Sequence, residues 1–392
     1  MATRTCPGCG ANPCELFYEL ASVPTNSRWL APSRHHAVAL PRGDIALNFC
    51  QGCGLVFNEA FDPELGGDTG FPEELDESPP IFEALRRRLA DPLIEHYALR
   101  DKDILEIGQG RGEFLALLGK LGANHRIGLD ACNAPHLPPS PGEIDVTFRQ
   151  ELLTEETTAP PSDLVCSKSL LQNVAEPAQF LKLLRRTLHE DARLFIQVSN
   201  FMRTLTNVAF WEINYASCSY FSPGTLYRIL RAQSFAVNDV WTDFDAEYLM
   251  ADARPANRET ADSSPSENIE TIADLAGLVA RFAHECREKQ AMWCEILSKL
   301  AGGGNRIAIW GAGSKTASFL TTLAVGDEVS YVVDTNPGRQ GKFTPGTGHR
   351  IVAPDVMVSM RPDVVIVMNS VLAFQIRDLL AEAGCAPTLL IA

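Results

Sequence analysis

The sequence lacks three features that would place it in other classes of protein. Basic residues are not in excess: 34 Lys and Arg stand against 49 Asp and Glu, and the formal net charge of −15 argues against a nucleic-acid backbone or an anionic membrane as the main partner. No apolar run approaches the length of a membrane span, and the N-terminus has no signal-peptide pattern. We therefore expect a cytoplasmic protein whose partners are neither nucleic acids nor membranes.

A disulfide framework is also missing. The eleven cysteines are spread over 392 residues, and in a reducing compartment closely paired cysteines are more often metal ligands. Two pairs have C-x-x-C spacing beside a glycine, Cys6 with Cys9 and Cys50 with Cys53. Two such pairs make a tetrahedral four-cysteine site for a structural zinc ion, because four thiolates leave no open position. The alternative, a redox C-x-x-C, would account for one pair but not for two.

The chain does contain a strand that breaks into glycines. The run Ile104–Ile107 has the pattern of a buried parallel strand, Gly108, Gly110 and Gly112 follow it, and a helical pattern begins at Phe114. Such a turn brings backbone amides to the carboxyl end of the strand, where open α/β sheets bind ligands, and glycine lets a ligand approach the main chain closely. The G-x-G-x-G spacing is tighter than the dinucleotide fingerprint and favours S-adenosylmethionine (SAM) over NAD. A glycine turn that only lets the helix pack on the strand is the alternative.

Further strands alternate with helices, which predicts a doubly wound parallel sheet. The second strand ends at Asp130, an acid placed either to accept hydrogen bonds from ribose hydroxyls or simply to cap a turn. The segment Lys168–Asn173 would then lie at the ligand-binding edge, next to Ser167. The other expected strands are Asp145–Phe148, Ser162–Ser167 and Arg193–Ser199.

The stretch Phe210–Phe221 gathers aromatic and small polar residues, and a helix is expected to start at Ser222 and Pro223. Two interpretations of this stretch stay open. It is either an aromatic core segment or a wall of the active site, to which the following side chains would contribute: Asn214, Tyr215, Ser217 and Tyr220.

A second α/β unit follows a polar linker at 253–267 and a long amphipathic helix at 269–300. The strand Arg306–Trp310 leads into a glycine turn that ends at Lys315, and the next strand ends at Asp334. This turn either holds a nucleotide phosphate or belongs to a Rossmann-like domain with an empty site, because a fold does not by itself imply a working site.

With these pieces in place, the chain resembles the bacterial sugar C-methyltransferases of antibiotic and polysaccharide pathways along nearly its whole length. The matching stretches are Cys6/Cys9 with Cys50/Cys53, Cys53–Phe57, Glu106–Gly112, Leu170–Pro177, Ser219–Ser222 and Val333–Thr347. The resemblance implies an α/β protein with an N-terminal four-cysteine zinc-binding domain (1–65) and a central class I SAM methyltransferase domain with a Rossmann-like fold (66–252). A linker with a long helix (253–300) and a C-terminal Rossmann-like domain (301–392) would complete it.

The resemblance also implies site residues. Glu106, Gly108, Gly110 and Asp130 should line the SAM site together with Gly112 and Ser167, and the segment Phe71–Ser78, including Ser78, should fold over the cofactor. The C-terminal domain would close a cleft over a small-molecule acceptor, which is either nucleotide-linked or free. A monomer and a homodimer both fit the resemblance.

One departure from the family pattern bears on catalysis. Family members commonly carry Tyr-x-Glu-His before the Ser-Tyr-Phe, with the Tyr and His as acid/base groups around the methylated carbon. The aligned residues here are Asn214, Ala216 and Ser217, none of which titrates near neutral pH. Tyr215 lies one position on, but an unperturbed phenol with a pKa of about 10 is a poor base. Glu247 is an added carboxylate where the family tends to have a Gly-Gln-type turn, so we take Tyr215, Ser217 and Glu247 as the catalytic candidates.

These features predict a SAM-dependent methyltransferase acting on a small biosynthetic intermediate of a natural-product or sugar pathway. Either its acceptor differs from the usual keto-sugar carbon, or a base is recruited from elsewhere, such as Glu247 or His36. Two alternatives stay open. The scaffold could bind SAM without transferring the methyl group, or the C-terminal turn could make the protein a nucleotide-dependent oxidoreductase, against which its short G-x-G argues.

Overall fold

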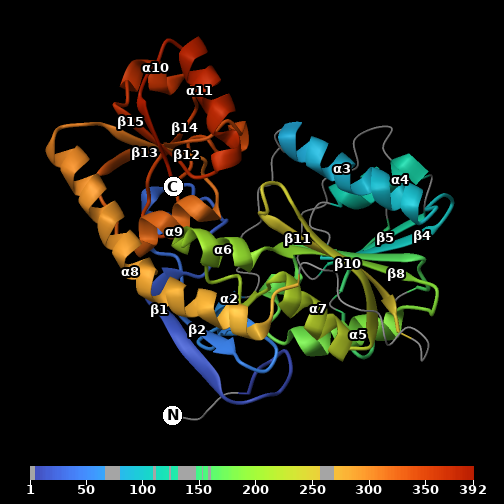
Figure 1. Cartoon of the computed structure of the whole chain (residues 1–392). Coiled ribbons are helices and arrows are strands. Elements are labelled where there is room, and N and C mark those ends of the chain that lie inside the picture. Colours follow the sequence, from blue (N-terminus) through green and yellow to red (C-terminus); the bar gives the residue numbers. More distant parts are fainter. Residues whose placement is uncertain are drawn as a thin grey trace.

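The computed structural model describes residues 5–66, 80–108, 112–122, 125–130, 147–151, 153–157, 160–256 and 269–392. Two α/β units flank an N-terminal sheet, and one long helix runs beside that sheet to the C-terminal unit (Figure 1). The expected class, an α/β protein with two Rossmann-like units and a cysteine-bearing N-terminal part, is confirmed.

The N-terminal sheet is antiparallel and has the strand order β1-β2-β3-β9. Its last strand comes from a segment more than 150 residues further along the chain, so the N-terminal and central units share a sheet. The alternation of apolar and polar residues in β2 places Ile45, Leu47 and Phe49 in the core. The elements of this part are β1 (Cys14–Pro24), α1 (Arg34–Val38), β2 (Arg42–Cys50), β3 (Val56–Asn58), α2 (Pro63–Gly66) and β9 (Ser219–Tyr220).

The central sheet has seven strands in the order β10-β11-β8-β7-β4-β5-β6. Six of them run in the same direction, while β11 runs antiparallel and lies between β8 and β10. The strand expected at Asp145–Phe148 is found as β6, and β11 extends to Pro255, so the sheet reaches into the segment that was expected to be a linker. The strands are β4 (Asp103–Ile107), β5 (His125–Asp130), β6 (Thr147–Gln150), β7 (Leu164–Lys168), β8 (Arg193–Ser199), β10 (Phe235–Asp243) and β11 (Tyr248–Pro255).

Helices cover both faces of the central sheet (Figure 1). Helices α3 and α4 close one apolar cluster with Ile104, Leu164 and Phe195, and helices α5 and α7 close the other with Leu105 and Val165. The elements are α3 (Pro80–His96), α4 (Glu113–Gly122), η1 (Leu171–Asn173), α5 (Pro177–Thr187), α6 (Phe201–Asn207), η2 (Phe210–Glu212) and α7 (Pro223–Ala232).

Helix α8 (Ile272–Gly302) leads to the C-terminal unit. A capping box starts it: the Thr271 hydroxyl accepts the Asp274 amide, and the Asp274 carboxylate accepts the Thr271 amide. The C-terminal sheet is parallel, in the order β14-β13-β12-β15-β16. Its elements are β12 (Ile307–Trp310), α9 (Ser314–Thr322), β13 (Val329–Val333), η3 (Pro337–Arg339), β14 (Ile351–Val352), α10 (Val356–Met360), β15 (Val364–Val367), η4 (Ser370–Leu372), α11 (Ala373–Glu382) and β16 (Thr388–Ile391).

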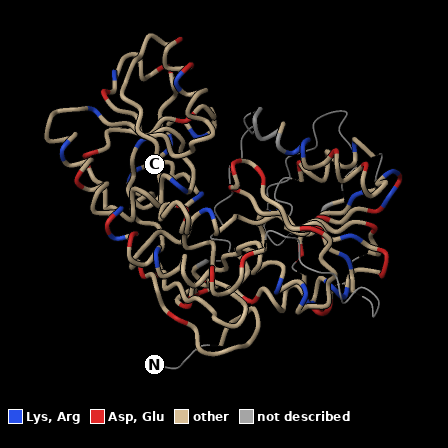
Figure 2. The backbone as a smooth tube through the Cα atoms, viewed as in Figure 1, with Lys and Arg blue, Asp and Glu red and all other residues tan. Residues whose placement is uncertain are grey.

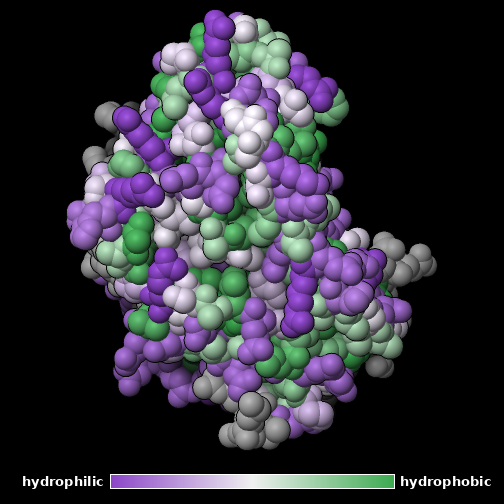
Figure 3. Space-filling view, turned by 90° about the vertical axis from the view of Figure 1, so that its left-hand side faces the viewer, coloured by the Kyte–Doolittle hydropathy of each residue, from purple (hydrophilic) through white to green (hydrophobic). Residues whose placement is uncertain are grey.

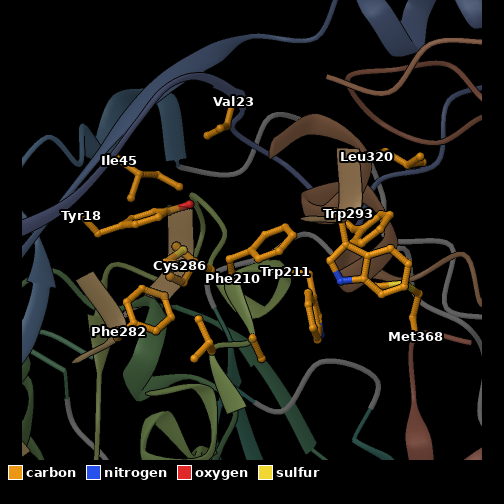
Figure 4. Packing of buried hydrophobic residues seen from close by; sticks show 14 of the residues in the cluster. Tyr18, Val23, Ile45, Phe210, Trp211, Phe282, Cys286, Trp293, Leu320 and Met368 are labelled. Atoms are coloured by element: carbon orange, nitrogen blue, oxygen red, sulfur yellow. The ribbon is translucent and has the colours of Figure 1, made fainter. Parts of the chain in front are cut away.

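One apolar cluster joins all three parts (Figure 4). The ring of Phe319 on α9 lies 5.2 Å from that of Trp293 on α8 and 6.0 Å from that of Phe210, and Tyr18 on β1 lies 5.9 Å from Phe282. Because these contacts are buried, they fix the C-terminal unit against the other two. The surface viewed in Figure 3 shows apolar side chains in separate patches among polar ones, and among the described residues no helix is long and apolar enough to span a membrane.

Candidate functional site

The four cysteines of the two C-x-x-C pairs come together as expected. All their sulfur atoms lie within 4.8 Å of one another, and the closest pairs, Cys6 with Cys53 and Cys9 with Cys50, are 3.6 Å apart. In each pair an amide from within the loop points at the first sulfur: Gly8 donates to Cys6 and Gly52 to Cys50, both at 3.3 Å. Such a set of thiols has the ligand type and the tetrahedral spacing that zinc prefers.

The glycine turn of the central sheet lies at the carboxyl end of β4, which lies between β7 and β5. Glu106 near the end of that strand is 2% exposed, and Gly108 follows with φ +72°. A Cβ at Gly108 would lie 2.7 Å from the Leu170 side chain, so the turn has no space for one. Gly112 also has a positive φ, of +70°, just before α4. The expected strand and helix are present on either side of the turn, and both of its described residues, Gly108 and Gly112, have backbone angles that favour glycine.

Several buried polar atoms at this edge have no hydrogen-bond partner in the described part of the chain. They are the Ser167 hydroxyl oxygen on β7, the Gln197 amide oxygen on β8 and the Gln172 amide oxygen in η1. Each residue is at most 4% exposed. Because buried polar atoms are normally hydrogen-bonded, three such atoms at the ligand-binding edge of one sheet indicate a site that a ligand or ordered water completes.

Of the other residues predicted for the cofactor site, the structure describes only some. Asp130 ends β5 and so lies at the same edge of the sheet as Glu106. Ser78, with the segment 71–78, and Gly110 lie outside the described residues, so their roles stay predictions.

Of the two catalytic candidates in the aromatic stretch, Tyr215 faces the N-terminal sheet. Its hydroxyl oxygen accepts the Asp62 amide at 2.8 Å, and its ring takes the space a side chain at Gly43 would occupy. Burial raises the pKa of Tyr215, so even less of the basic phenolate is present at neutral pH. Ser217 is buried, and its amide donates to the Asn214 side chain at 3.2 Å.

The stretch Phe210–Phe221 therefore contributes to the core, and its role as a wall of the active site stays a prediction. Phe210 and Trp211 are buried beside α9, and the Tyr220 hydroxyl donates to the Asn214 carbonyl. A small pocket of about 230 Å³, part of it open to solvent, lies beside Asn214 and Tyr215, between β1 and α9.

The third catalytic candidate, Glu247, lies in the hairpin turn between β10 and β11, next to the carboxyl end of β8. Acidic residues mark this turn in Figure 2. Lys315 of the C-terminal unit reaches across to it, with 2.9 Å between its Nζ and one carboxylate oxygen of Glu247 and 3.4 Å to Glu212. Arg203 pairs with Glu212 at 2.5 Å on the other side. The second Glu247 oxygen is buried and has no hydrogen-bond partner within the described ranges.

The C-terminal glycine turn is closed by its own side chains. The Asp334 carboxylate accepts the Ala312 amide at 2.7 Å and the Asn336 amide at 2.8 Å, and Arg339 lies 3.2 Å from it. Lys315, which the sequence offered as a phosphate ligand, is turned towards Glu247 instead. The pairing of Lys315 with Glu247 is the contact that sequence reasoning missed, because the two residues belong to different units and share no local motif.

Solved structures with a related sheet include methyltransferases. The 1,6-didemethyltoxoflavin-N1-methyltransferase of Burkholderia thailandensis is 20% identical, with a TM-score of 0.35, covering 48% of this chain and 95% of its own. The magnesium protoporphyrin IX methyltransferase of Synechocystis is 14% identical, with a TM-score of 0.36, covering 45% of this chain and 84% of its own.

Family models match both α/β units. The methyltransferase domain matches residues 81–240, and the C-methyltransferase C-terminal domain matches residues 249–385. Both α/β units of this chain thus match methyltransferase family models, and the second model is that of a C-methyltransferase. The C-methyltransferase NovU of Streptomyces niveus is 25% identical over 293 residues, which are 71% of this chain and 69% of NovU.

The residues at the edge of the methyltransferase sheet fit the cofactor that the family uses. Gly108 has the positive φ that glycine favours, and unpartnered polar oxygens lie on β7, β8 and η1 near the same edge of the sheet. SAM supplies an electrophilic methyl group there, and the part of the protein is to bind it, exclude water and present an acceptor to it.

Proposed function

We propose that this enzyme transfers the methyl group of SAM to a small biosynthetic intermediate of a sugar or natural-product pathway, at the interface between the central and C-terminal units. The proposal is supported by the match of both units to methyltransferase families and by the unpartnered polar oxygens at the carboxyl edge of the central sheet. One observation supports the position of the acceptor: Lys315 of the C-terminal unit pairs with Glu247 of the central unit, so this carboxylate lies where the two units meet.

In this proposal Glu247 faces the acceptor and takes its proton. The residues aligned with the usual base are Asn214, Ala216 and Ser217, and none of them titrates near neutral pH. The Tyr215 hydroxyl oxygen already accepts a hydrogen bond from the Asp62 amide. The imidazole of His36 lies 2.7 Å from the Ser33 hydroxyl at the start of α1, in the N-terminal part. Of the candidate bases, this leaves the carboxylate of Glu247 at the edge of the sheet. The roles of Tyr215 and Ser217 stay predictions.

The acceptor atom follows from the strength of this base. A carboxylate can take a proton from a carboxylic acid or an ammonium group, and from an enolisable carbon beside a carbonyl where the site stabilises the developing enolate. Because methyl transfer is an in-line displacement, most of the remaining rate enhancement comes from holding the nucleophile in position.

The test is a turnover assay with keto-sugars, carboxylic acids and amines as acceptors, free and nucleotide-linked. S-adenosylhomocysteine formation is followed by mass spectrometry, and the methyl position is assigned by NMR. Glu247→Gln should lower turnover at least tenfold and leave the affinity for S-adenosylhomocysteine unchanged. Glu190→Gln, which alters an exposed carboxylate in a loop after α5, is the control. Equal turnover in Glu247→Gln and wild type would remove Glu247 from the mechanism.

One observation favours a second function, SAM binding without transfer: the family's titrating residues are absent from their usual positions. This alternative predicts tight binding of SAM and S-adenosylhomocysteine and no methylated product with any acceptor in the panel. A single methylated product excludes it.

We further propose that the four-cysteine cluster holds a structural zinc ion. The four sulfurs lie within 4.8 Å of one another, which suits one tetrahedral ion. Elemental analysis should find about one zinc per chain, and substitution of Cys9 and Cys50 by serine should abolish it. Protein that folds fully without metal after treatment with a chelator would argue against a structural role.

A further inference from the structure

The second cysteine loop, which contains Cys53, lies against two helices. Gly54, which follows Cys53, has φ +84°. Side chains of both helices leave no space for a Cβ there: Arg228 and Thr225 of α7 and Leu275 of α8 would each come within 3.0 Å of it. The cysteine loop, the central unit and the first turn of the helix that leads to the C-terminal unit therefore meet at one residue.

The Arg228 guanidinium joins this loop to the start of α8. Its Nε donates to the main-chain carbonyl of Cys53 at 2.9 Å, and its Nη1 donates to the main-chain carbonyl of Glu270 at 3.1 Å. The third nitrogen, Nη2, is buried 3.8 Å from a carboxylate oxygen of Glu270 and makes no hydrogen bond within the described ranges. Glu270 directly precedes Thr271, the N-cap of α8. One side chain therefore contacts both a predicted metal ligand and the residue before the helix cap.

Glu270 is also bound to the start of α7. Its carboxylate accepts the Gly224 amide at 2.9 Å and the Ser222 hydroxyl, and its side chain is 10% exposed. A carboxylate is favoured at this place because the first amides of a helix have no partner within the helix. The Thr225 hydroxyl in turn donates to the Gly54 carbonyl at 2.9 Å. These bonds fix the point at which α8 leaves the central unit.

A bound metal ion would gain from a cation at this place. Four thiolates around one divalent ion leave an excess of negative charge, and the groups that surround a metal's ligands tune its affinity. The Cys6 and Cys50 sulfurs already have amide donors, from Gly8 and Gly52. Arg228 instead acts through its charge and through the main chain of a ligand residue.

We propose that Arg228 is a positioning residue that links zinc binding at the four-cysteine cluster to the first turn of α8. An ion that holds the Cys53 loop in place keeps its carbonyl within reach of Arg228, which in turn holds Glu270. The inference rests on the proposed zinc site and extends its role to the position of the C-terminal unit, which follows α8. It requires no covalent bond to form or break.

Zinc release and hydrogen exchange test the linkage on the zinc-loaded protein. A chromophoric chelator is titrated into it to give the zinc affinity, and hydrogen–deuterium exchange is followed by mass spectrometry in the first and last turns of α8. The variants are Arg228→Met and Arg228→Lys. Arg231→Met is the control, because Arg231 lies on the same helix and donates to the Tyr227 hydroxyl on that helix.

Arg228→Met should lower the zinc affinity about tenfold or more and raise exchange in the first turns of α8, while its last turns stay protected. Arg228→Lys keeps the charge but cannot donate to both carbonyls at once, so it should recover only part of the zinc affinity and leave exchange raised. Removal of zinc from wild type should raise exchange in the same first turns, and this measurement depends on no variant. Arg231→Met should match wild type.

The results that would overturn the inference differ from those that would overturn the zinc site. If Arg228→Met changes neither the zinc affinity nor the exchange, or only one of them, the linkage fails although the zinc site stands. The same holds if exchange rises equally along α8, which would be general unfolding, or if zinc removal leaves the first turns unchanged. If wild type binds no zinc, the metal assignment itself fails and takes the inference with it.

Discussion

The chain contains two versions of one local structure, a parallel strand that enters a glycine turn and then a helix. In the central unit the turn after β4 lies at a sheet edge where buried side-chain oxygens, such as those of Ser167 and Gln197, have no partner in the described part of the chain. In the C-terminal unit the polar groups of the turn after β12 have partners within the protein: Asp334 accepts the Ala312 amide, and Lys315 is paired with Glu247. The comparison shows that a glycine turn indicates a ligand site only when the groups around it still lack partners.

The difference also assigns the two units different tasks. Near the central turn, buried oxygens lack partners within the described residues, and a cofactor could bond to them. At the C-terminal turn, Asp334 accepts a backbone amide of the turn, and Lys315 pairs with Glu247 of the central unit. This argues against the oxidoreductase alternative, because a nucleotide phosphate at the C-terminal turn would have to displace the Asp334 carboxylate.

The largest expected effect comes from adding one methyl group to each turn. Gly108→Ala places a Cβ 2.7 Å from the Leu170 side chain, whereas Gly311→Ala, also at a positive φ (+103°), meets nothing within 4 Å. Each should lose about 1–3 kcal/mol of stability from backbone strain. Only Gly108→Ala should also weaken S-adenosylhomocysteine binding, by about tenfold or more, as measured by calorimetry.

Gly311→Ala is the matched control for this comparison, since it imposes similar backbone strain at the equivalent place. Equal loss of cofactor affinity in both variants would mean that the two turns are not functionally distinct.

The sequence predicted what depends on local patterns. The strand that ends at Ile107, the helix α4 that follows Gly112, and the meeting of Cys6 and Cys9 with Cys50 and Cys53 all follow from spacing and periodicity. The family stretch Val333–Thr347 led to the C-terminal domain, which its family model confirms.

What the sequence did not predict depends on contacts between distant segments. No local sequence pattern predicts that Ser219–Tyr220 adds a strand to the N-terminal sheet, or that Lys315 pairs with Glu247. The hydroxyl of Tyr215 is likewise directed by a packing partner, Gly43, far away in the chain. Such contacts are fixed by the assembled core rather than by local sequence.

The second effect concerns the contact between the two units. Lys315→Met leaves two partly buried carboxylates, Glu247 and Glu212, without that cation, so Glu247 should no longer be held towards the acceptor. We expect turnover to fall about tenfold while S-adenosylhomocysteine affinity stays unchanged, which corresponds to the loss of one charge-assisted contact. Lys315→Arg should restore much of the activity.

A phosphate-binding role for Lys315 predicts a different pattern. In that case Lys315→Met would raise KM for a nucleotide-linked acceptor, leave kcat unchanged, and have no effect on the free acceptor. Steady-state kinetics with both forms of the acceptor distinguishes the two roles.

The smallest expected effect concerns Asp334, whose hydrogen bonds occupy the polar groups of the C-terminal turn. Asp334→Asn puts an amide group where the carboxylate accepts two backbone amides and pairs with Arg339, so at least one of these donors is left unmet. Leaving a buried group unmet costs about 1–3 kcal/mol, which urea unfolding measures directly. S-adenosylhomocysteine affinity should not change, because the other turn is untouched. If NAD raised the melting temperature of wild type and Asp334→Asn removed that rise, the C-terminal turn would be a nucleotide site, and Asp334 would be one of its ligands rather than the group that closes it.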